Sequence, residues 1–153
     1  MSDPSEDKPR VSDAEMLERF QNSKKRPPCS DTLGMHLAEV EQDAKRIRMD
    51  FDVPGMFANP TGAVQGGFIA AMMDEAMSTC CIIASNVTMT APTLELKTSY
   101  LLRLMPGSAS VEARILKWGR SAAFMEAECF DADGKLVAKA TATAIPMPFK
   151  RLS

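Results

Sequence analysis

A pair of carboxylates interrupts the most apolar stretch of the chain. Most residues from 68 to 84 are Ala, Met, Ile, Phe or Cys, and Asp74 and Glu75 break this run. A carboxylate is costly to bury without a partner, so its position needs a functional or structural reason. Such an acid suits a general base or a nucleophile that attacks an acyl group. The alternatives are ion pairs with Arg or Lys across a subunit boundary, or a helix that is partly exposed at this point.

Two glycines, Gly66 and Gly67, stand where the preceding loop turns into the apolar segment. In a helix their N–H groups would belong to the unsatisfied first turn and carry the positive end of the helix dipole. This position suits a carbonyl oxygen, and one donor aimed at a developing oxyanion stabilises a transition state by roughly 3–4 kcal/mol. Asp74 follows Gly66 by eight positions, and Ser78 lies one turn further along nearly the same face.

Other catalytic machinery is missing from the sequence. Its one histidine, His36, has no GxSxG motif to accompany it, so a Ser-His-Asp triad is unsupported and we interpret His36 as structural. The four cysteines lack CxxC spacing, and we expect all of them to be reduced core residues. Phosphate-binding glycine motifs are also missing. One histidine excludes a His-rich metal site, although carboxylates could still hold a metal. We expect no metal and no cofactor, and the net charge of -2 argues against nucleic-acid binding.

Hydrophobic periodicity predicts the elements that position these residues. Residues 64–84 are rich in Ala and Met and poor in β-branched residues, which favours one long helix. Strict alternation predicts a strand at 44–53, with 32–42 as its partner. Four more strand patterns follow at 93–102, 108–118, 121–131 and 135–145, and the last three are joined by short hairpins. In the first of these, alternation places Thr93 on the same face as Glu95.

The N-terminal part differs in character from the rest. Residues 1–10 are polar and are predicted to be disordered, and 12–23 form an amphipathic helix with a capping signal, Ser12 followed by Glu15. Consecutive prolines then end the helix. We divide the chain into an N-terminal segment at 1–32, one domain at 33–148 and a tail at 149–153. Without an apolar leader, and with the apolar run broken by acids, we expect a cytoplasmic protein that does not enter a membrane.

The predicted fold class is α+β, with the central helix apolar on almost every side. Such a helix must be covered all round, and a sheet of five to six strands covers one side only. A second copy of the chain is the natural cover for the rest. We therefore expect a homodimer, and the sequence leaves open whether two dimers pair into a homotetramer.

The stretch NPTGAVQGGFIAAMMDEAMS at 59–78 resembles the signature of the hotdog-fold acyl-CoA thioesterases, in particular the phenylacetate-degradation type. That signature has Asn, a short Gly-containing loop, His-Gly-Gly, an apolar helix and then Asp or Glu. The resemblance extends from about Leu33 to Pro146. It implies a hotdog fold, in which a curved antiparallel sheet wraps around one long helix. It also implies an enzyme that hydrolyses an acyl-CoA thioester to free CoA and a carboxylic acid.

The resemblance also implies catalytic roles. Gly66 would donate its N–H to the thioester carbonyl, and Asn59 would orient this oxygen or a nearby water. Asp74, reaching over from the partner subunit, would be the nucleophile or general base, and Thr93 would hold the water or the carboxylate. Substrate binding would fall to Gln65, Gly67, Ser78, Arg103, Lys117 and Arg120. The three basic residues would meet the CoA phosphates, and the alternative for each is a solvated surface charge.

Gln65 departs from the family signature, which has histidine at this position. Glutamine can donate and accept hydrogen bonds, but it cannot carry a proton near pH 7. This favours the alternative of a non-catalytic module that binds acyl-CoA or a fatty-acyl group. A purely structural dimerisation domain is a third possibility. A group of apolar residues could form an adaptable acyl pocket or belong to the ordinary core: Met56, Phe57, Met72, Met73 and Met77.

Overall fold

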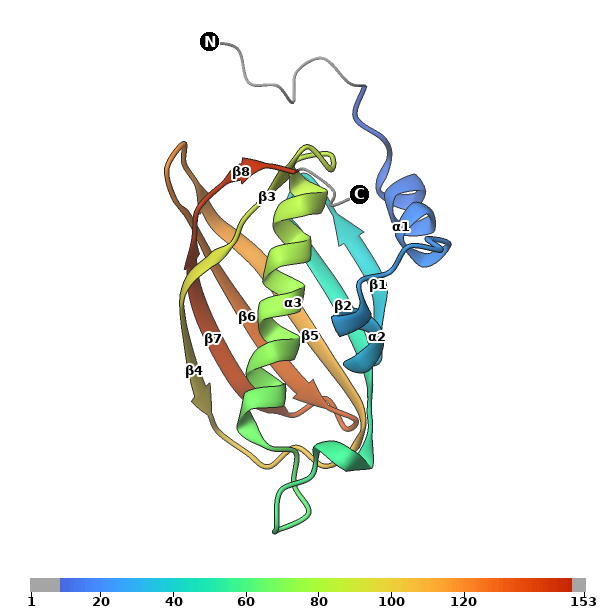
Figure 1. Ribbon diagram of the computed structural model, residues 1–153, viewed down its shortest axis with the longest axis vertical. Helices are drawn as coiled ribbons and strands as arrows, with labels where there is room; N and C mark the ends of the chain where they lie inside the picture. Colours follow the sequence, from blue (N-terminus) through green and yellow to red (C-terminus); the bar gives the residue numbers. More distant parts are fainter. Residues whose placement is uncertain (1–8, 150–153) are drawn as a thin grey trace.

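A computed structural model describes residues 9–149 of the 153-residue chain. Its main feature is a curved six-stranded antiparallel sheet that wraps around one long helix, α3 (Gly66–Ala84) (Figure 1). The strand order is β1-β2-β5-β6-β7-β4. The strands are β1 (Met35–Glu41), β2 (Arg46–Val53), β4 (Thr93–Tyr100), β5 (Gly107–Trp118), β6 (Ala123–Asp131) and β7 (Leu136–Ala144). The predicted α+β architecture is confirmed.

The long helix α3 has clear start and stop signals. Gln65 is its N-cap and Ser85 its C-cap, after which Asn86 and Val87 adopt positive φ angles of 53° and 63°. A β-branched residue rarely adopts this conformation, so the chain turns sharply away from the helix there. The helix is long and apolar enough to cross a membrane, but nine of its residues are buried against the sheet. It is therefore the core helix of this domain.

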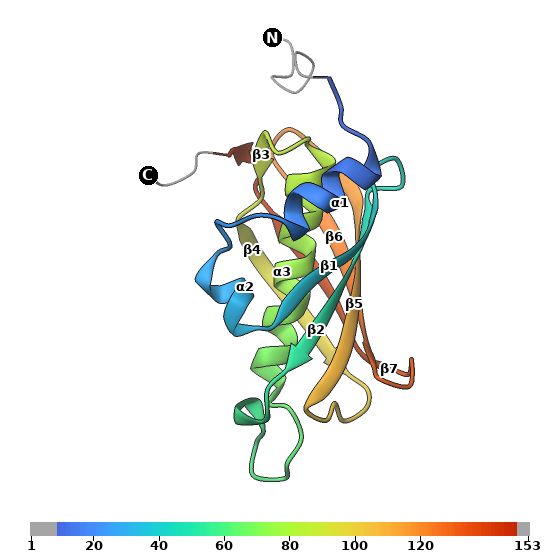
Figure 2. The same ribbon diagram turned by 90° about the vertical axis from the view of Figure 1, so that its right-hand side faces the viewer.

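The sheet separates an apolar inner face from a charged outer face. Ile47, Met49 and Phe51 alternate along β2 and are almost completely buried under α3, as the sequence pattern predicts. The alternate residue Arg46 lies on the outer face and pairs with Glu41 and Glu112. These outer side chains are partly exposed, and among residues 9–149 no helix packs on this face of the sheet (Figure 2).

The N-terminal segment covers the free edge of β1. It contains α1 (Asp13–Gln21) and α2 (Pro28–Thr32), and α1 packs beside β1 with Met16 fully buried (Figure 2). Polar side chains of the segment also satisfy backbone groups along this edge, as an edge strand requires. The pairs are Gln21 with the Leu37 carbonyl at 3.0 Å, Arg26 with the Met35 carbonyl, and Asp13 with the Gln42 N–H at 3.1 Å.

Several details differ from the sequence-based expectations. α1 ends at Gln21, before the two prolines, and the second proline begins α2, because proline is well tolerated at the first position of a helix. A 3-10 helix, η1 (Gly55–Phe57), and a small ladder of β3 (Met89–Thr90) with β8 (Met147–Pro148) were not predicted. Cys29 on α2 is exposed, so it is not the core residue that we expected. Most of the predicted disordered stretch, residues 1–8, lies outside the described part of the chain.

The other three cysteines lie in the core, as predicted. Cys80 and Cys81 face inward from α3, and Cys129 faces inward from β6. Burial raises the pKa of each of these thiols to about 12. They are therefore protonated at neutral pH and poorly suited to nucleophilic chemistry.

Candidate functional site

Asp74 lies in the middle of α3 and accepts a hydrogen bond from the edge strand. The Thr93 hydroxyl donates to Asp74 Oδ1 at 2.6 Å, and both residues are half-buried. The expected alternation is wrong at this point, because a β-bulge separates Thr93 from Glu95 in the pairing with β7. The bulge leaves Leu94 exposed and turns Thr93 toward the helix. Without this extra residue the hydroxyl would point to the other face of the sheet.

The neighbouring acid, Glu75, is held by an element on another side of the helix. Ser30 on α2 is completely buried and donates its hydroxyl to Glu75 Oε1 at 2.6 Å. Consecutive helical residues point about 100° apart, which allows the two acids to reach different elements. Each carboxylate thus has a hydroxyl partner within its own chain. The N-terminal segment uses Glu75, while Asp74 faces the open edge strand β4.

Gln65 caps the first turn of α3. Its side-chain oxygen accepts the Gly67 N–H at 2.7 Å, and its backbone carbonyl accepts the Phe68 N–H at 3.0 Å. A side-chain oxygen at this position satisfies one of the orphan donors of the first turn. Within residues 9–149, the Gly66 N–H has no acceptor. The arrangement leaves one unpaired donor at the positive end of the helix, which is where a carbonyl oxygen could bind.

Tyr100 joins this end of the helix, and sequence reasoning did not identify it. Its hydroxyl donates to the Gly66 carbonyl oxygen at 2.7 Å. The strand pattern placed Tyr100 on the same face as Leu96 and Thr98, but no sequence signal connected it with a residue 34 positions away. The tyrosine is the last residue of β4, so it links the edge strand to the start of α3.

Asn59 lies in the loop before α3, where its side-chain oxygen is already engaged. That oxygen accepts hydrogen bonds from the Thr61 N–H at 2.9 Å and the Thr61 hydroxyl at 2.7 Å. This Asx turn shapes the loop that leads into the helix. Only the amide nitrogen of Asn59 would therefore be available to orient a substrate or a water.

The structure does not bring all the predicted site residues together within one chain. Asp74 is eight residues from Gly66 on a continuous helix, a separation of about 12 Å along its axis. Ser78 is half-buried one turn beyond Asp74 and therefore lies still further from Gly66. No single thioester group could contact both the Gly66 amide and the Asp74 carboxylate of the same chain.

The three predicted phosphate-binding residues are also divided. Arg103 is exposed in the loop after β4. A hydrogen bond of 2.8 Å from the Val64 N–H to the carbonyl of the adjacent Leu104 holds this loop beside the start of α3. Lys117 and Arg120 are exposed at the hairpin between β5 and β6, at the opposite end of the sheet (Figure 1). Contact with the same substrate would therefore require two copies of the chain.

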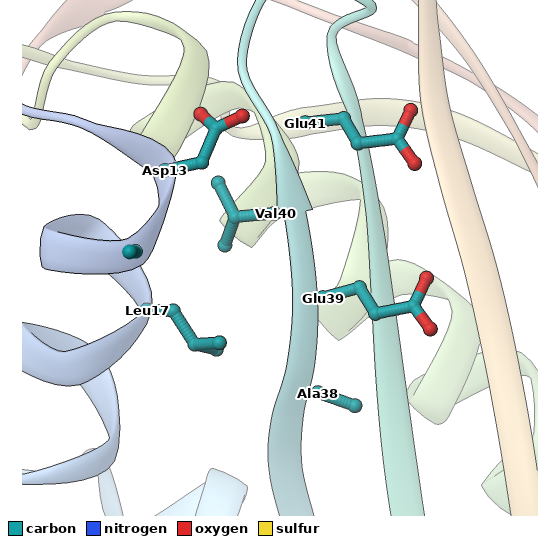
Figure 3. Close-up of a pocket in the computed structure, with 7 residues that line it drawn as sticks. Asp13, Leu17, Ala38, Glu39, Val40 and Glu41 are labelled. Carbon is teal, nitrogen blue, oxygen red and sulfur yellow. The ribbon is translucent and has the colours of Figure 1, made fainter.

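A hollow between α1 and β1 does not belong to this site. Asp13 and Leu17 line it from α1 and Val40 from β1, while Glu39 and Glu41 point away from α1 (Figure 3). Its glutamates are neutralised by arginines of β2, and hydrogen bonding to an arginine lowers the pKa of Glu41. The proposed acyl-pocket residues are divided between the core and the surface. Phe57, Met72, Met73 and Met77 are core residues, whereas Met56 is exposed.

His36 takes no part in this arrangement. It lies exposed on β1 and pairs with Asp52 of β2 at 3.0 Å. The structural interpretation of this histidine agrees with its position, because both partners lie far along the sheet from β4.

Comparison with known proteins identifies the family. The family model of the thioesterase superfamily matches residues 61–138, which include the start of α3, Asp74, Thr93 and Tyr100. The chain belongs to the thioesterase superfamily. The resemblance to hotdog-fold thioesterases, and with it the predicted hotdog fold, is thereby confirmed.

Two solved structures share the fold of this thioesterase-superfamily chain, and one further protein matches part of its sequence. An inferred thioesterase of Ralstonia eutropha JMP134, related to phenylacetic acid degradation, is 30% identical with a TM-score of 0.77, covering 85% of this chain and 98% of that one. A Streptococcus mutans protein, solved bound to acetyl CoA, has a TM-score of 0.71 at 19% identity, with coverage of 84% and 97%. An inferred esterase of Saccharolobus solfataricus is 33% identical over 84 residues, which span 55% of this chain and 59% of that relative.

Proposed function

We propose that this chain is an acyl-CoA thioesterase that hydrolyses a thioester to free CoA and a carboxylic acid. The observation that carries the proposal is the unpaired Gly66 N–H at the start of α3, together with the Thr93-held Asp74 further along. Membership in the thioesterase superfamily supports the reaction class. The acetyl CoA bound by the Streptococcus mutans protein of similar fold supports CoA thioesters as the substrate class.

The proposed active site is shared between two copies of the chain. The separation of about 12 Å along α3 prevents one chain from supplying both principal groups to one thioester. The edge of β4 is open, and Leu94 and Tyr100 on it are 62% and 50% exposed. On α3 a stripe of half-buried residues faces the same side: Ala70, Asp74, Ser78 and Ile82. A symmetric dimer through this face would cover apolar surface and bring Asp74 of a second copy toward Gly66.

In this reaction, the Gly66 N–H polarises the thioester carbonyl and stabilises the oxyanion that develops on it. Asp74 of the second copy either takes a proton from the attacking water or attacks the carbonyl carbon itself, forming an anhydride that water opens. In both routes the C–S bond breaks, CoA leaves as the thiol after protonation, and the water oxygen ends in the carboxylic acid. Thr93 keeps the carboxylate oriented, and the Asn59 amide orients the carbonyl or the water.

Several further features belong to the same proposal. Antiparallel pairing through β4 would place the β5–β6 hairpin of the second copy toward the Gly66 end, so Lys117 and Arg120 could join Arg103 around the CoA phosphates. Gln65 and Gly67 shape the oxyanion site. Ser78 of the second copy lines the shared active site one turn beyond Asp74. CoA is part of the substrate, and water and the protein's own side chains supply the remaining chemistry. We place the enzyme in the cytoplasm, as a homodimer or as a pair of homodimers.

The direct test is release of free thiol from acyl-CoA esters with short, medium, long and aromatic acyl groups. We expect hydrolysis of at least one class, and its loss in Asp74→Asn with the dimer still folded. Binding of acyl-CoA without hydrolysis of any ester would instead support a non-catalytic acyl-CoA binding module. Absence of both binding and hydrolysis would support a structural dimerisation domain.

A matched pair of variants tests the oxyanion donor. Gly66→Pro removes the N–H at the first helical position, where proline is tolerated, and the extended Gln65 suits the residue before a proline. Gly66→Ala keeps the N–H but adds the same Cβ, which would lie 3.0 Å from the Tyr100 ring in either variant. The two variants share the Cβ and differ in the N–H, which proline replaces with a ring carbon, so we expect Gly66→Pro to be at least about 100-fold slower than Gly66→Ala. Equal rates would exclude the Gly66 N–H from the mechanism.

A further inference from the structure

Gly66 lies between two peptide groups that are both held in place. The peptide before it is fixed through the Gln65 carbonyl, which accepts the Phe68 N–H at 3.0 Å. The peptide after it is held at both ends. Its N–H, which belongs to Gly67, donates to Gln65 Oε1 at 2.7 Å, and its carbonyl accepts the Tyr100 hydroxyl at 2.7 Å. The unpaired Gly66 N–H is therefore the one free group in a constrained turn.

These restraints matter because glycine has no side chain to limit its own backbone. Tyr100 supplies both a hydrogen bond and a steric wall. A Cβ at position 66 would lie 3.0 Å from its Cζ and 3.2 Å from its Cε1, so the ring packs closely against this side of Gly66 and would have to shift by a few tenths of an ångström to admit a Cβ. The restraint comes from a different element, since Tyr100 ends β4. It ties the direction of the helix N-terminus to the edge of the sheet.

We propose that Tyr100 is a positioning residue for the proposed thioester hydrolysis. Its hydroxyl holds the Gly66 carbonyl, and its ring packs against the side of Gly66 where a Cβ would lie. The Gly66 N–H is thereby aimed before substrate arrives. A donor that is oriented in advance needs no reorganisation when the oxyanion forms, and small errors in position are costly to the rate. Tyr100 acts through Gly66 and does not itself touch the reacting atoms.

The kinetic test compares Tyr100→Phe with Ser99→Ala. The first variant removes only the hydroxyl and keeps the ring, and the second removes an exposed hydroxyl from the adjacent position of β4. We expect Tyr100→Phe to lower kcat by about tenfold and leave KM within about twofold, because the surface that binds substrate is unchanged. Ser99→Ala should match the wild type. An unchanged kcat in Tyr100→Phe would overturn the proposal.

A second measurement is independent of catalysis. Nitrogen relaxation and hydrogen exchange of the Gly66 and Gly67 amides, recorded without substrate, report the restraint itself. We expect faster exchange and lower order parameters at both amides in Tyr100→Phe and no change in Ser99→Ala. Unchanged amides in Tyr100→Phe would refute the restraint whether or not the protein hydrolyses a thioester. If the wild type hydrolyses no ester, the proposed function fails, and the amide measurement still decides the role of Tyr100.

Discussion

Replacing Thr93 with valine removes the hydroxyl that holds Asp74 and changes the shape of the side chain little. In the folded chain, Asp74 Oδ1 would lose a hydrogen bond of 2.6 Å from a neutral donor to a carboxylate. Hydrogen bonds to charged groups contribute about 1.5–3 kcal/mol, and half-burial of both residues favours the lower end. We therefore expect a loss of about 1.5 kcal/mol in the free energy of unfolding, which lowers Tm by roughly 3–6 °C for a chain of this size.

The same change should lower turnover, because the carboxylate would no longer be held toward the reacting carbon. We expect kcat to fall about tenfold, which corresponds to about 1.4 kcal/mol in the barrier. The assays are thermal unfolding by circular dichroism and thiol release from the best acyl-CoA ester. Thr93→Ser is the control, since it keeps the hydroxyl on the same bulged backbone. If the valine variant matched the serine variant in both Tm and kcat, the reasoning about this hydrogen bond would be wrong.

Two other predictions concern the rest of the chain. At pH 8 a thiol-specific reagent should label the exposed Cys29 rapidly and spare the three buried cysteines, because their raised pKa of about 12 keeps them as thiols. All four should be labelled after unfolding. Mass spectrometry counts the labels, and rapid labelling of more than one thiol in the folded protein would contradict this prediction. Ser30→Ala should lower the free energy of unfolding by about 1–3 kcal/mol, because it leaves Glu75 without its hydroxyl partner. Denaturant titration would measure this loss, with Ser99→Ala as a control at an exposed site.

Most of the fold could be predicted from the sequence because its patterns are locally determined. Alternation along β2 reflects a sheet with one buried face, and the apolar run of α3 reflects a helix enclosed by that sheet. The capping signal of α1 was equally clear, with Ser12 accepting the Glu15 N–H at 3.2 Å. The elements that escaped prediction are short. A two-residue ladder and a five-residue helix give no periodicity to detect.

The site was less predictable because it depends on contacts between distant residues. Gly66 and Asp74 could be found from their spacing along one helix. The residues that hold them, Tyr100 and Thr93, could not be predicted, because they come from an edge strand whose register includes a bulge. Gln65 looked like a loss of function beside the family histidine. Its observed contact shows that a side-chain oxygen here also caps the helix, which requires no proton transfer.

The central claim is that one active site uses Gly66 of one copy and Asp74 of another. The most direct test mixes two inactive variants, Gly66→Pro and Asp74→Asn, after unfolding and refolding them together. In a shared site, each mixed dimer carries one site with both changes and one site with neither, so equal mixing should restore about a quarter of the wild-type activity. Each variant refolded alone should remain inactive. If the mixture also stayed inactive while mass spectrometry showed mixed dimers, the two groups would not act across the subunit boundary, and the account would be contradicted.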